Sequence, residues 1–363
     1  KIKEREVLKE RFISGAIDLS GMTKHKAEKL YETIEAFSNY GFNKSHSICY
    51  SIDSYYSAWL HTHYEKEWLA TCLQTWNGSP KFGKIVAEIK SFGYTILPPD
   101  INTSSEVWVF SEERNGFVPP LTAIKGVGSA AVYEIMRRRP FKSLDGLLFD
   151  ENEKWAPSKM NKTSFDSLCK VEAFGSLEEL SSGKIANHCQ LHEIIIGSYP
   201  SLKKGKYGLT KSALKRARAE RGEVQPLLDE KIIESSDLPD WQRSTKIAHS
   251  IALLSNVDDD LLFPPTIMKK IKKANVQSIA DITGNNKGIA WFCIQEINEK
   301  VTKNGKVFYK MKVVDDNSNS SWLRVWTKFK VLPELYTMWL AEIASTADWG
   351  CSTSSYKMKQ LAV

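Results

Sequence analysis

Apolar side chains recur at helical spacing through the first part of this sequence. The repeat predicts one helix over Lys1–Ile17 and a second over Lys24–Phe37. Asn39-Tyr40-Gly41 is expected to end the second helix, because Asn and Gly favour helix termini. After a short polar loop, a pattern rich in Tyr and Trp predicts a long helix from Ile48 to Trp76. The N-terminal region is therefore expected to be helical.

The predicted elements become shorter after this region. A helix is expected over Lys81–Phe92, followed by a strand over Tyr94–Leu97 that ends at two prolines. The segment Val107–Lys184 mixes short strands with small helices. Ser181–Gly284 is polar and basic at first and helical later, so its architecture is the hardest to predict.

The last part of the chain changes to the alternating pattern of β-strands. Alternation begins at Gly288 and continues through Val307–Val314 and Trp322–Trp326. Turn signals separate these strands, at Asn304-Gly305 and at residues 316–319. A small closed barrel is the natural architecture for such a tail. The predicted fold class is multidomain α+β.

Charge is distributed unevenly along the 363 residues, whose formal net charge is +7. Between Ser201 and Glu223 there are eight Lys or Arg residues and two Glu. Such an excess favours a polyanionic partner, although a solvated charged helix face would look the same. No run approaches the roughly 18 apolar residues of a membrane span, so no membrane partner is expected. The first residue is not Met, and we expect a fragment or a processed piece.

A candidate nucleic-acid contact lies in the run from Ala123 to Ala131. Two glycines, Gly126 and Gly128, flank one apolar residue, and a helix-forming run follows. This is a helix-hairpin-helix pattern. Its glycines let backbone N–H groups approach a phosphate without obstruction from Cβ. We therefore predict sequence-independent DNA binding by Lys125, Gly126, Val127, Gly128 and Ser129. A second element, Asn161–Leu177, could be a partner hairpin or core packing, and core packing is the favoured interpretation.

A polar run, Asn43-Lys44-Ser45-His46, interrupts the aromatic helices. Burying these four side chains together would cost several kcal/mol, because each would need a polar partner. A loop that carries Lys and His at a helix N-terminus could hold an anionic group such as a triphosphate. From the residues alone, an ordinary capped turn remains the favoured interpretation.

Several runs resemble the alpha subunit of bacterial DNA polymerase III, a C-family replicative polymerase. The fingers region of that family is similar to FSNYGFNKSHSICYSIDSYYSAWLHTHYEKEWLATCL (residues 37–73). Its tandem helix-hairpin-helix region is similar to LTAIKGVGSAAVYEIM (121–136) and NKTSFDSLCKVEAFGSL (161–177). Its oligonucleotide/oligosaccharide-binding (OB) barrel is similar to residues 288–326. The matches occur in the family's order, and FNKSH with IKGVG is a specific combination.

The resemblance implies a domain plan and a function. The plan is helical fingers at 1–106, a tandem helix-hairpin-helix region at 107–180, a basic and helical connection at 181–284 and an OB-fold domain at 285–363. The function implied is DNA-directed DNA polymerisation in replication. The catalytic aspartates and their Mg²⁺ ions would lie in a palm outside this chain. This chain alone is then expected to be inactive, with no catalytic or metal-binding residue of its own.

The resemblance also implies partners for individual residues. Asn43, Lys44, Ser45 and His46 would face the incoming dNTP, and the hairpin would hold primer-template DNA. The barrel would bind single-stranded template through aromatics such as Trp291, Phe308 or Trp322, and through Lys303 and Lys306. A sliding-clamp contact is expected at Gln225, Leu227 and Leu228. The other partner is the palm-containing remainder of the polymerase, in the cytoplasm of a bacterial or phage-infected cell.

Two other interpretations remain open at this stage. One is a non-catalytic DNA-binding accessory module of replication. The presence of FNKSH argues against it, because a mere binding module has no need of a nucleotide-facing loop. The other is an unrelated helical repair protein with one hairpin, which does not explain the ordered series of matches.

Overall fold

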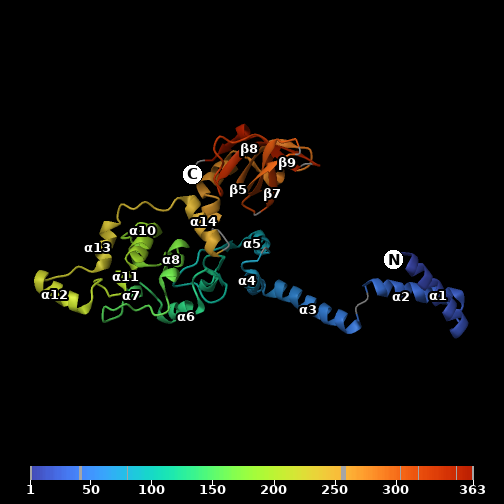
Figure 1. Ribbon diagram of the computed structural model, residues 1–363, viewed down its shortest axis with the longest axis horizontal. Helices are drawn as coiled ribbons and strands as arrows, with labels where there is room; N and C mark the ends of the chain where they lie inside the picture. The colour runs from blue at the N-terminus through green and yellow to red at the C-terminus, as the bar shows by residue number, and fades with distance from the viewer. Residues whose placement is uncertain are drawn as a thin grey trace. The chain divides into compact units, whose positions relative to one another are not determined.

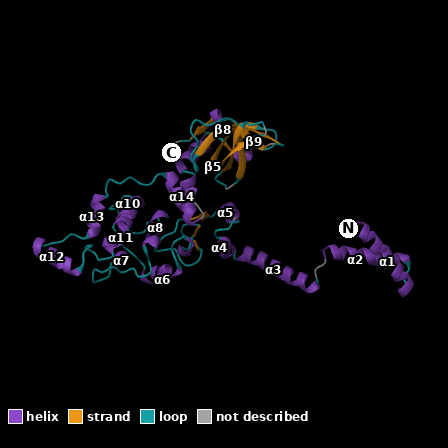
Figure 2. Cartoon of the chain, in the orientation of Figure 1, coloured by secondary structure: helices purple, strands orange, loops and turns teal. Residues whose placement is uncertain are grey.

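The computed structural model describes residues 2–40, 43–79, 81–254, 259–302, 304–317, 319–348 and 350–361. The chain divides into two compact units, Lys1–Glu65 and Lys66–Val363. The division falls inside the predicted fingers region. Figures 1 and 2 show the elements of each unit, which we describe separately.

The first unit consists of three helices. The helices are α1 (Ile2–Ser20), α2 (Lys24–Tyr40) and α3 (Lys44–His63). α1 packs against α2, where the rings of Phe12 and Tyr31 lie 5.5 Å apart and Ala27 is fully buried. No side chain of α3 is buried, although this helix is rich in aromatic residues. The predicted long helix from Ile48 to Trp76 is interrupted at Tyr64, whose φ of −134° and ψ of 51° end α3.

The second unit opens with two helices and a small sheet. The elements are α4 (Glu65–Trp76), α5 (Phe82–Ser91), β1 (Thr95–Ile96), β2 (Val109–Ser111) and β3 (Gly116–Val118). The strand order is β1-β3-β2, with β1 parallel and β2 antiparallel to β3. Leu69, Phe82 and Phe117 belong to the apolar core that holds the helices on this sheet. Gly93 ends the preceding helix with a φ of +84°, as its place in the sequence predicted.

A helical module follows, and its core extends well beyond the predicted boundary at residue 180. Its elements are η1 (Leu121–Ala123), α6 (Ser129–Arg138), α7 (Leu144–Leu148), α8 (Lys162–Lys170), α9 (Glu178–Ser181), α10 (His188–His192), η2 (Glu193–Gly197), α11 (Tyr199–Leu202), α12 (Lys211–Arg221) and α13 (Leu227–Glu234). One apolar core runs from Ile101 to Ile232. Phe165, Leu168 and Phe174 are fully buried in it, which confirms the interpretation of Asn161–Leu177 as core packing.

Three helices lead from this module into the barrel. They are α14 (Arg243–Leu254), α15 (Asp259–Leu262) and α16 (Pro265–Lys273). Ile247, Phe263 and Ile271 share a core with Trp291 and Met338 of the barrel. These helices therefore cover part of the barrel rather than forming a free linker.

The C-terminal strands form the predicted OB barrel. The strands and short helices are β4 (Gln277–Ser278), η3 (Ile279–Asp281), β5 (Lys287–Val301), β6 (Val307–Val314), β7 (Ser320–Val325), β8 (Met338–Thr346), β9 (Gly350–Thr353), η4 (Ser355–Lys357) and β10 (Met358–Gln360). β5 pairs with β6, β6 with β7, β7 with β9 and β9 with β8, and β8 pairs again with β5. Only the β7–β9 pairing of these five is parallel. The predicted α+β class with a helix-hairpin-helix module is confirmed, and the pairing of β5–β9 gives the barrel-like sheet expected of an OB fold.

Candidate nucleic-acid interface

The hairpin between η1 and α6 is held by two buried side chains. Ile124 is 1% exposed and Val127 is 4% exposed, so both anchor the turn in the core of the helical module. Lys125, Gly126 and Gly128 are exposed between and beside these anchors. The turn therefore presents its backbone and one lysine to solvent, while the predicted contact residue Val127 directs its side chain inward.

The two glycines of the hairpin are under different structural constraints. Gly126 has a φ of +93°, and a Cβ at this position would lie 2.6 Å from Oγ of Ser167. Its carbonyl oxygen accepts a hydrogen bond of 3.0 Å from the hydroxyl of Ser164. Gly128 has an ordinary φ of −77°, and a Cβ there would meet no atom within 4 Å. Gly126 is thus required by packing on α8, whereas Gly128 leaves open space above the backbone.

The hairpin amides differ in whether they have partners. Lys125 N–H donates to the carbonyl of Leu253 at 2.9 Å, and Val127 N–H donates to that of Ile124 at 3.0 Å. Within the described part of the chain, the amides of Gly126, Gly128, Ser129 and Ala130 make no hydrogen bond. These N–H groups lie at and just before the N-terminus of α6, where the helix dipole favours an anion. The geometry fits a phosphate.

A buried carboxylate holds α6 in place. Glu134 is 5% exposed, and its side chain accepts hydrogen bonds from the amides of Ser158, Lys159 and Met160 at 2.7, 2.7 and 3.1 Å. Burial raises the pKa of Glu134, but these bonds to the charged form outweigh it, and the net pKa is lowered. The carboxylate stays ionised and fixes the loop before α8 against α6.

The arginines at the end of α6 serve two purposes. Arg138 donates to the carbonyl of Leu147 at 2.7 Å, and Arg139 donates to that of Ser104 at 2.6 Å. Both therefore hold neighbouring backbone. Arg137 is exposed and adds positive charge to the surface at the C-terminal end of α6.

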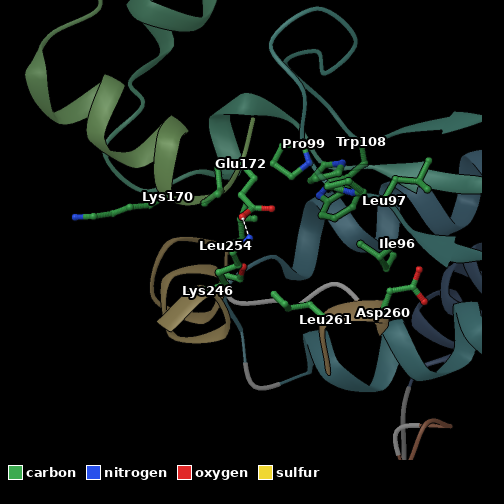
Figure 3. A pocket seen from close by; sticks show the side chains of 14 residues that line it. Ile96, Leu97, Pro99, Trp108, Lys170, Glu172, Lys246, Leu254, Asp260 and Leu261 are labelled. Atoms are coloured by element: carbon green, nitrogen blue, oxygen red, sulfur yellow. Dashed lines mark ion pairs between the residues drawn. The ribbon is translucent and has the colours of Figure 1, made fainter. Parts of the chain in front are cut away.

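α14 contacts the helical module at two turns, through Lys246 with Glu172 and through the carbonyl of Leu253 with Lys125. Its Lys246 lies 2.7 Å from the carboxylate of Glu172 and 2.5 Å from that of Asp240. Glu172 adopts a φ of +59° in the second turn, a conformation in which non-glycine residues are uncommon. A cavity of about 330 Å³ lies beside this ion pair (Figure 3), lined mainly by apolar side chains such as Ile96 and Trp108. The ion pair and the Lys125–Leu253 hydrogen bond fix α14 against the module.

The predicted nucleotide-facing segment begins α3 in the first unit. Asn43 is the N-cap residue, and its Oδ1 accepts from the amide of His46 at 2.7 Å and from the hydroxyl of Ser45 at 2.9 Å. The His46 ring lies 4.5 Å from that of Tyr50. Lys44 is exposed in the first turn of this 20-residue helix. Asn43 thus makes the capped turn expected from the residues alone, and Lys44 adds charge to the positive end of the helix dipole.

The outer face of β6 and β7 gathers aromatic and basic side chains. Lys310 lies opposite Arg324, and Lys312 lies opposite Trp322. The ammonium of Lys310 lies 4.3 Å from the centre of the Trp322 ring, which is 43% exposed. This is the strand face with which OB folds bind oligonucleotides.

A second aromatic pair extends this face. Phe308 and Trp326 stack with ring centres 5.0 Å apart, and the Lys306 ammonium lies 5.7 Å from the Trp326 ring. Lys310, Arg324 and Trp326 were not predicted as contact residues from the sequence. Alternate residues of a strand share one face, so Lys310 lies on the face of Phe308, and Arg324 and Trp326 lie on the face of Trp322.

Two other residues of the barrel were predicted to contact single-stranded template, Trp291 and Lys303. Trp291 is 4% exposed and packs edge-on against Phe263, so it is a core residue and its prediction as a stacking aromatic is wrong. It lies on the outer face of β5, where the helices α14–α16 cover the barrel, and strand alternation alone could not predict that cover. Lys303 lies outside the described residues.

The predicted clamp-binding residues lie at the start of α13. Leu228 is 5% exposed and Leu227 packs against the same core. Gln225 is exposed. Both leucines face the core of the helical module, so a clamp contact through them would require this turn to leave its packing.

Asp315, one of two adjacent carboxylates in the barrel, holds the turn between β6 and β7. It is 1% exposed and accepts hydrogen bonds from the hydroxyl of Ser278 at 3.0 Å and from the amide of Asn319 at 2.8 Å. The carboxylate of Asp315 therefore has a structural role in this turn. Among the residues that the structure describes, no group of three or more His, Cys, Asp or Glu is placed to hold a metal ion. None of the described helices is both long and apolar enough to span a bilayer.

An exposed glycine turn with open amides, followed by a helix on a compact helical core, defines a protein of the helix-hairpin-helix class. The family described as "Helix-hairpin-helix motif" matches residues 93–182. By sequence, the chain belongs over most of its length to the DNA polymerase III alpha subunit family, of which it represents a portion. The resemblance of the fingers, hairpin and barrel runs is confirmed.

Three relatives show the extent of this similarity. The DNA polymerase III subunit alpha of Aquifex aeolicus is 30% identical over 314 residues, which cover 85% of this chain and 24% of the relative. The same subunit of Thermus aquaticus is 34% identical over 50% of this chain and 15% of the relative. That of Vibrio cholerae is 35% identical over 51% of this chain and 16% of the relative. The chain spans at most about a quarter of the length of these relatives.

Proposed function

We propose that this chain is a DNA-binding portion of a replicative DNA-directed DNA polymerase. The observation that supports the proposal most directly is the hairpin at Lys125–Ser129, where the amides of Gly126, Gly128 and Ser129 have no partner within the described residues. A phosphate of the DNA backbone supplies the acceptors that these amides lack. Because phosphates repeat at every nucleotide, such a contact holds primer-template DNA irrespective of its sequence.

The Asn43–His46 segment is proposed to meet the incoming dNTP. Asn43 keeps the turn capped, and Lys44 and His46 extend beside the positive end of α3. A triphosphate would be attracted by the lysine charge and by the helix dipole together. In this proposal Asn43 and Ser45 shape the turn, and Lys44 makes the main charge contact.

The β6–β7 face of the barrel is proposed to bind the single-stranded template. Trp322 and the Phe308–Trp326 pair offer flat surfaces on which bases stack, and Lys306 and Lys310 lie beside the rings to meet the phosphates. Stacking accepts any base, which suits a template that passes through during synthesis.

The chemistry of nucleotide addition is proposed to depend on residues outside this chain. In the family resemblance, palm aspartates hold two Mg²⁺ ions, which align the primer hydroxyl with the α-phosphate of the nucleotide. The palm-containing remainder of the polymerase is therefore a proposed partner. The sliding clamp is another, with Gln225 as the one exposed residue of the predicted contact. A cytoplasmic location follows from this replicative role.

The hairpin is tested with variants that change its surface without disturbing its packing. Gly128→Val should fold normally, because the φ of −77° suits valine and no atom lies within 4 Å of the new Cβ. The valine would cover the open amides, so duplex affinity should fall about tenfold at moderate salt, and Lys125→Glu should weaken it further. Binding is measured by fluorescence anisotropy with a labelled duplex.

The matched control is Gly83→Val. Gly83 lies in α5, and a Cβ there also meets no atom within 4 Å. Its affinity for duplex DNA should equal that of the unmodified chain. Unchanged affinity of both hairpin variants would rule out the hairpin as a DNA contact.

A further inference from the structure

The helix α12 and the loop before it form a basic surface that the proposed function does not use. We call this surface the α12 surface and define it by Lys204, Lys211, Lys215, Arg216 and Arg221. All five side chains are exposed. Within the described part of the chain none of the five forms an ion pair, although the same module makes several ion pairs with its other basic residues.

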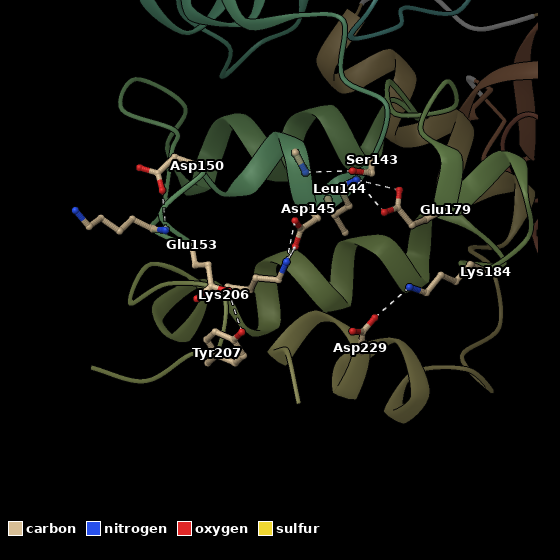
Figure 4. Close-up of polar contacts among 12 residues, drawn as sticks. Ser143, Leu144, Asp145, Asp150, Glu153, Glu179, Lys184, Lys206, Tyr207 and Asp229 are labelled. Atoms are coloured by element: carbon tan, nitrogen blue, oxygen red, sulfur yellow. Dashed lines mark hydrogen bonds and ion pairs between the residues drawn. The ribbon is translucent and has the colours of Figure 1, made fainter. Parts of the chain in front are cut away.

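The loop that leads into α12 is fixed firmly to the helical module (Figure 4). Lys206 lies 3.0 Å from the carboxylate of Asp145, and the hydroxyl of Tyr207 donates to Glu153 at 2.9 Å. The backbone amide of Lys206 donates to the carbonyl of Glu153 at 3.0 Å. Arg218 lies 4.9 Å from the centre of the Tyr207 ring and 3.8 Å from Glu153. The nearby acidic residues therefore position the helix and do not neutralise the α12 surface.

The helix itself is poorly stabilised by its own fold. α12 has 11 residues and buries none of them, and helices of this length are marginal in water without tertiary packing. Lys211 and Lys215 are like charges four residues apart, an arrangement that destabilises a helix. No acidic residue lies in the first turn, and Lys211 there opposes the helix dipole. Apart from Arg218, which pairs with Glu153, the basic residues of α12 have no ion-pair partner among the described residues.

We infer that the α12 surface binds the phosphate backbone of duplex DNA as a second contact, separate from the hairpin. Lys211 and Lys215 are separated by about 6 Å along the helix axis, so they can meet successive phosphates of one strand. A bound polyanion would relieve the repulsion among the basic side chains. Its negative charge would also interact favourably with the positive N-terminal end of the helix dipole, where Lys211 lies. The inference rests on the proposed DNA-binding function of the chain, but not on the hairpin itself.

The test is a triple variant, Lys211→Gln, Lys215→Gln and Arg216→Gln, in the full chain. Glutamine keeps helix propensity close to that of lysine and arginine. Affinity for a labelled duplex should fall at least tenfold at moderate salt. The slope of log affinity against log salt should become shallower by about 2 to 3, since each lost phosphate contact contributes about 0.9.

The matched control removes the same charge from α16, where Lys269, Lys270 and Lys273 are also exposed. The control triple glutamine variant should retain affinity and salt slope. An unchanged slope in the α12 variant, or an equal loss in the control, would overturn the inference. As a second measurement on the unmodified chain, the amides of residues 211–221 should become protected from hydrogen exchange when duplex is added; absence of protection would overturn it as well.

The Lys125→Glu variant separates this inference from the proposed function. If Lys125→Glu weakens binding and the α12 variant does not, the hairpin proposal stands and the α12 inference fails. If only the α12 variant loses affinity, the second contact stands and the hairpin proposal fails.

Discussion

At the scale of single residues, Glu134 shows how a buried charge can hold a binding element. Three backbone amides from the loop before α8 converge on its carboxylate, so α6 and the hairpin cannot shift independently of that loop. Hydrogen bonds to a charged group are stronger than neutral ones. The buried acid in an otherwise apolar helix face is therefore a structural element of the hairpin module.

Replacing this carboxylate should destabilise the chain. Glu134→Gln places an amide group against three N–H donors, and we expect the free energy of unfolding to fall by about 2 kcal/mol. Urea unfolding followed by tryptophan fluorescence measures the loss. Glu113→Gln, an exposed acid in the β2–β3 turn, should leave stability unchanged. Equal stability of the two variants would show that the three bonds contribute nothing net.

Lowering the pH should destabilise the folded chain, in part by protonating Glu134. The folded-state pKa of Glu134 is lowered, and so is that of Asp166, where bonds to Lys170 and His192 outweigh the effect of burial. A lowered folded pKa gives stability that is present above the ordinary carboxyl range and is lost as pH falls through the folded pKa. The free energy of unfolding should thus decline below roughly pH 4, and the decline should be smaller in Glu134→Gln.

Lys44 offers a residue-scale test of the nucleotide contact. In the full polymerase, Lys44→Ala should raise the apparent KM for dNTP about tenfold, because a charge-assisted phosphate contact is lost. Steady-state incorporation at varied dNTP concentration measures this. Lys26→Ala, an exposed lysine of α2, is the control. A normal KM in Lys44→Ala would remove the proposed role.

At the scale of elements, the two strands β6 and β7 together form the proposed template-binding face. Residues that alternate along both strands send Tyr309, Met311 and Leu323 into the barrel and leave Lys310 and Trp322 outside. Pairing then brings aromatic and basic side chains beside each other, which neither strand achieves alone. The face exists only once the register of the two strands is set.

This face can be tested with a single aromatic substitution. Trp322→Ala should weaken binding of a labelled single-stranded oligonucleotide by about tenfold, since stacking on one ring contributes about 1–3 kcal/mol per base. Tyr356→Ala is the control, because Tyr356 is 75% exposed on the same barrel but lies in η4. Equal effects of the two changes would argue against a dedicated template face.

At the scale of the whole molecule, the chain corresponds to only a small part of its relatives, and this part carries the proposed binding elements. The matched part of the chain covers 24% or less of the length of each of these relatives. Each binding element described here makes contacts with DNA or nucleotide in the proposal, and none supplies the paired carboxylates of nucleotide addition.

The chain by itself should therefore bind DNA without extending it. We expect a purified preparation to bind duplex and single-stranded DNA, with affinity that falls as salt rises. A primer-extension assay with all four dNTPs and Mg²⁺ should give no product, while the full polymerase run in parallel should extend the primer. Extension by the isolated chain would contradict the proposal that the catalytic carboxylates lie elsewhere.

Local signals in the amino-acid sequence were sufficient to predict several elements. Helical periodicity located α1 and α2, the Gly126–Gly128 spacing located the hairpin, and alternation with Asn304-Gly305 located the β5–β6 hairpin. These predictions succeeded because spacing, turn chemistry and burial pattern are properties of neighbouring residues. The run of motifs was also sufficient to identify the family.

Which side chains remain available to a ligand depends on the packing of the folded chain. The core that joins residues 101–232, the burial of Trp291 and the pairing of Lys206 with Asp145 depend on segments far apart in the sequence. Periodicity specifies that a residue lies on one face of an element, but not what packs against that face. For that reason the basic run at 201–223 was ambiguous in the sequence, and the fold separates its anchoring charges from its unpaired ones.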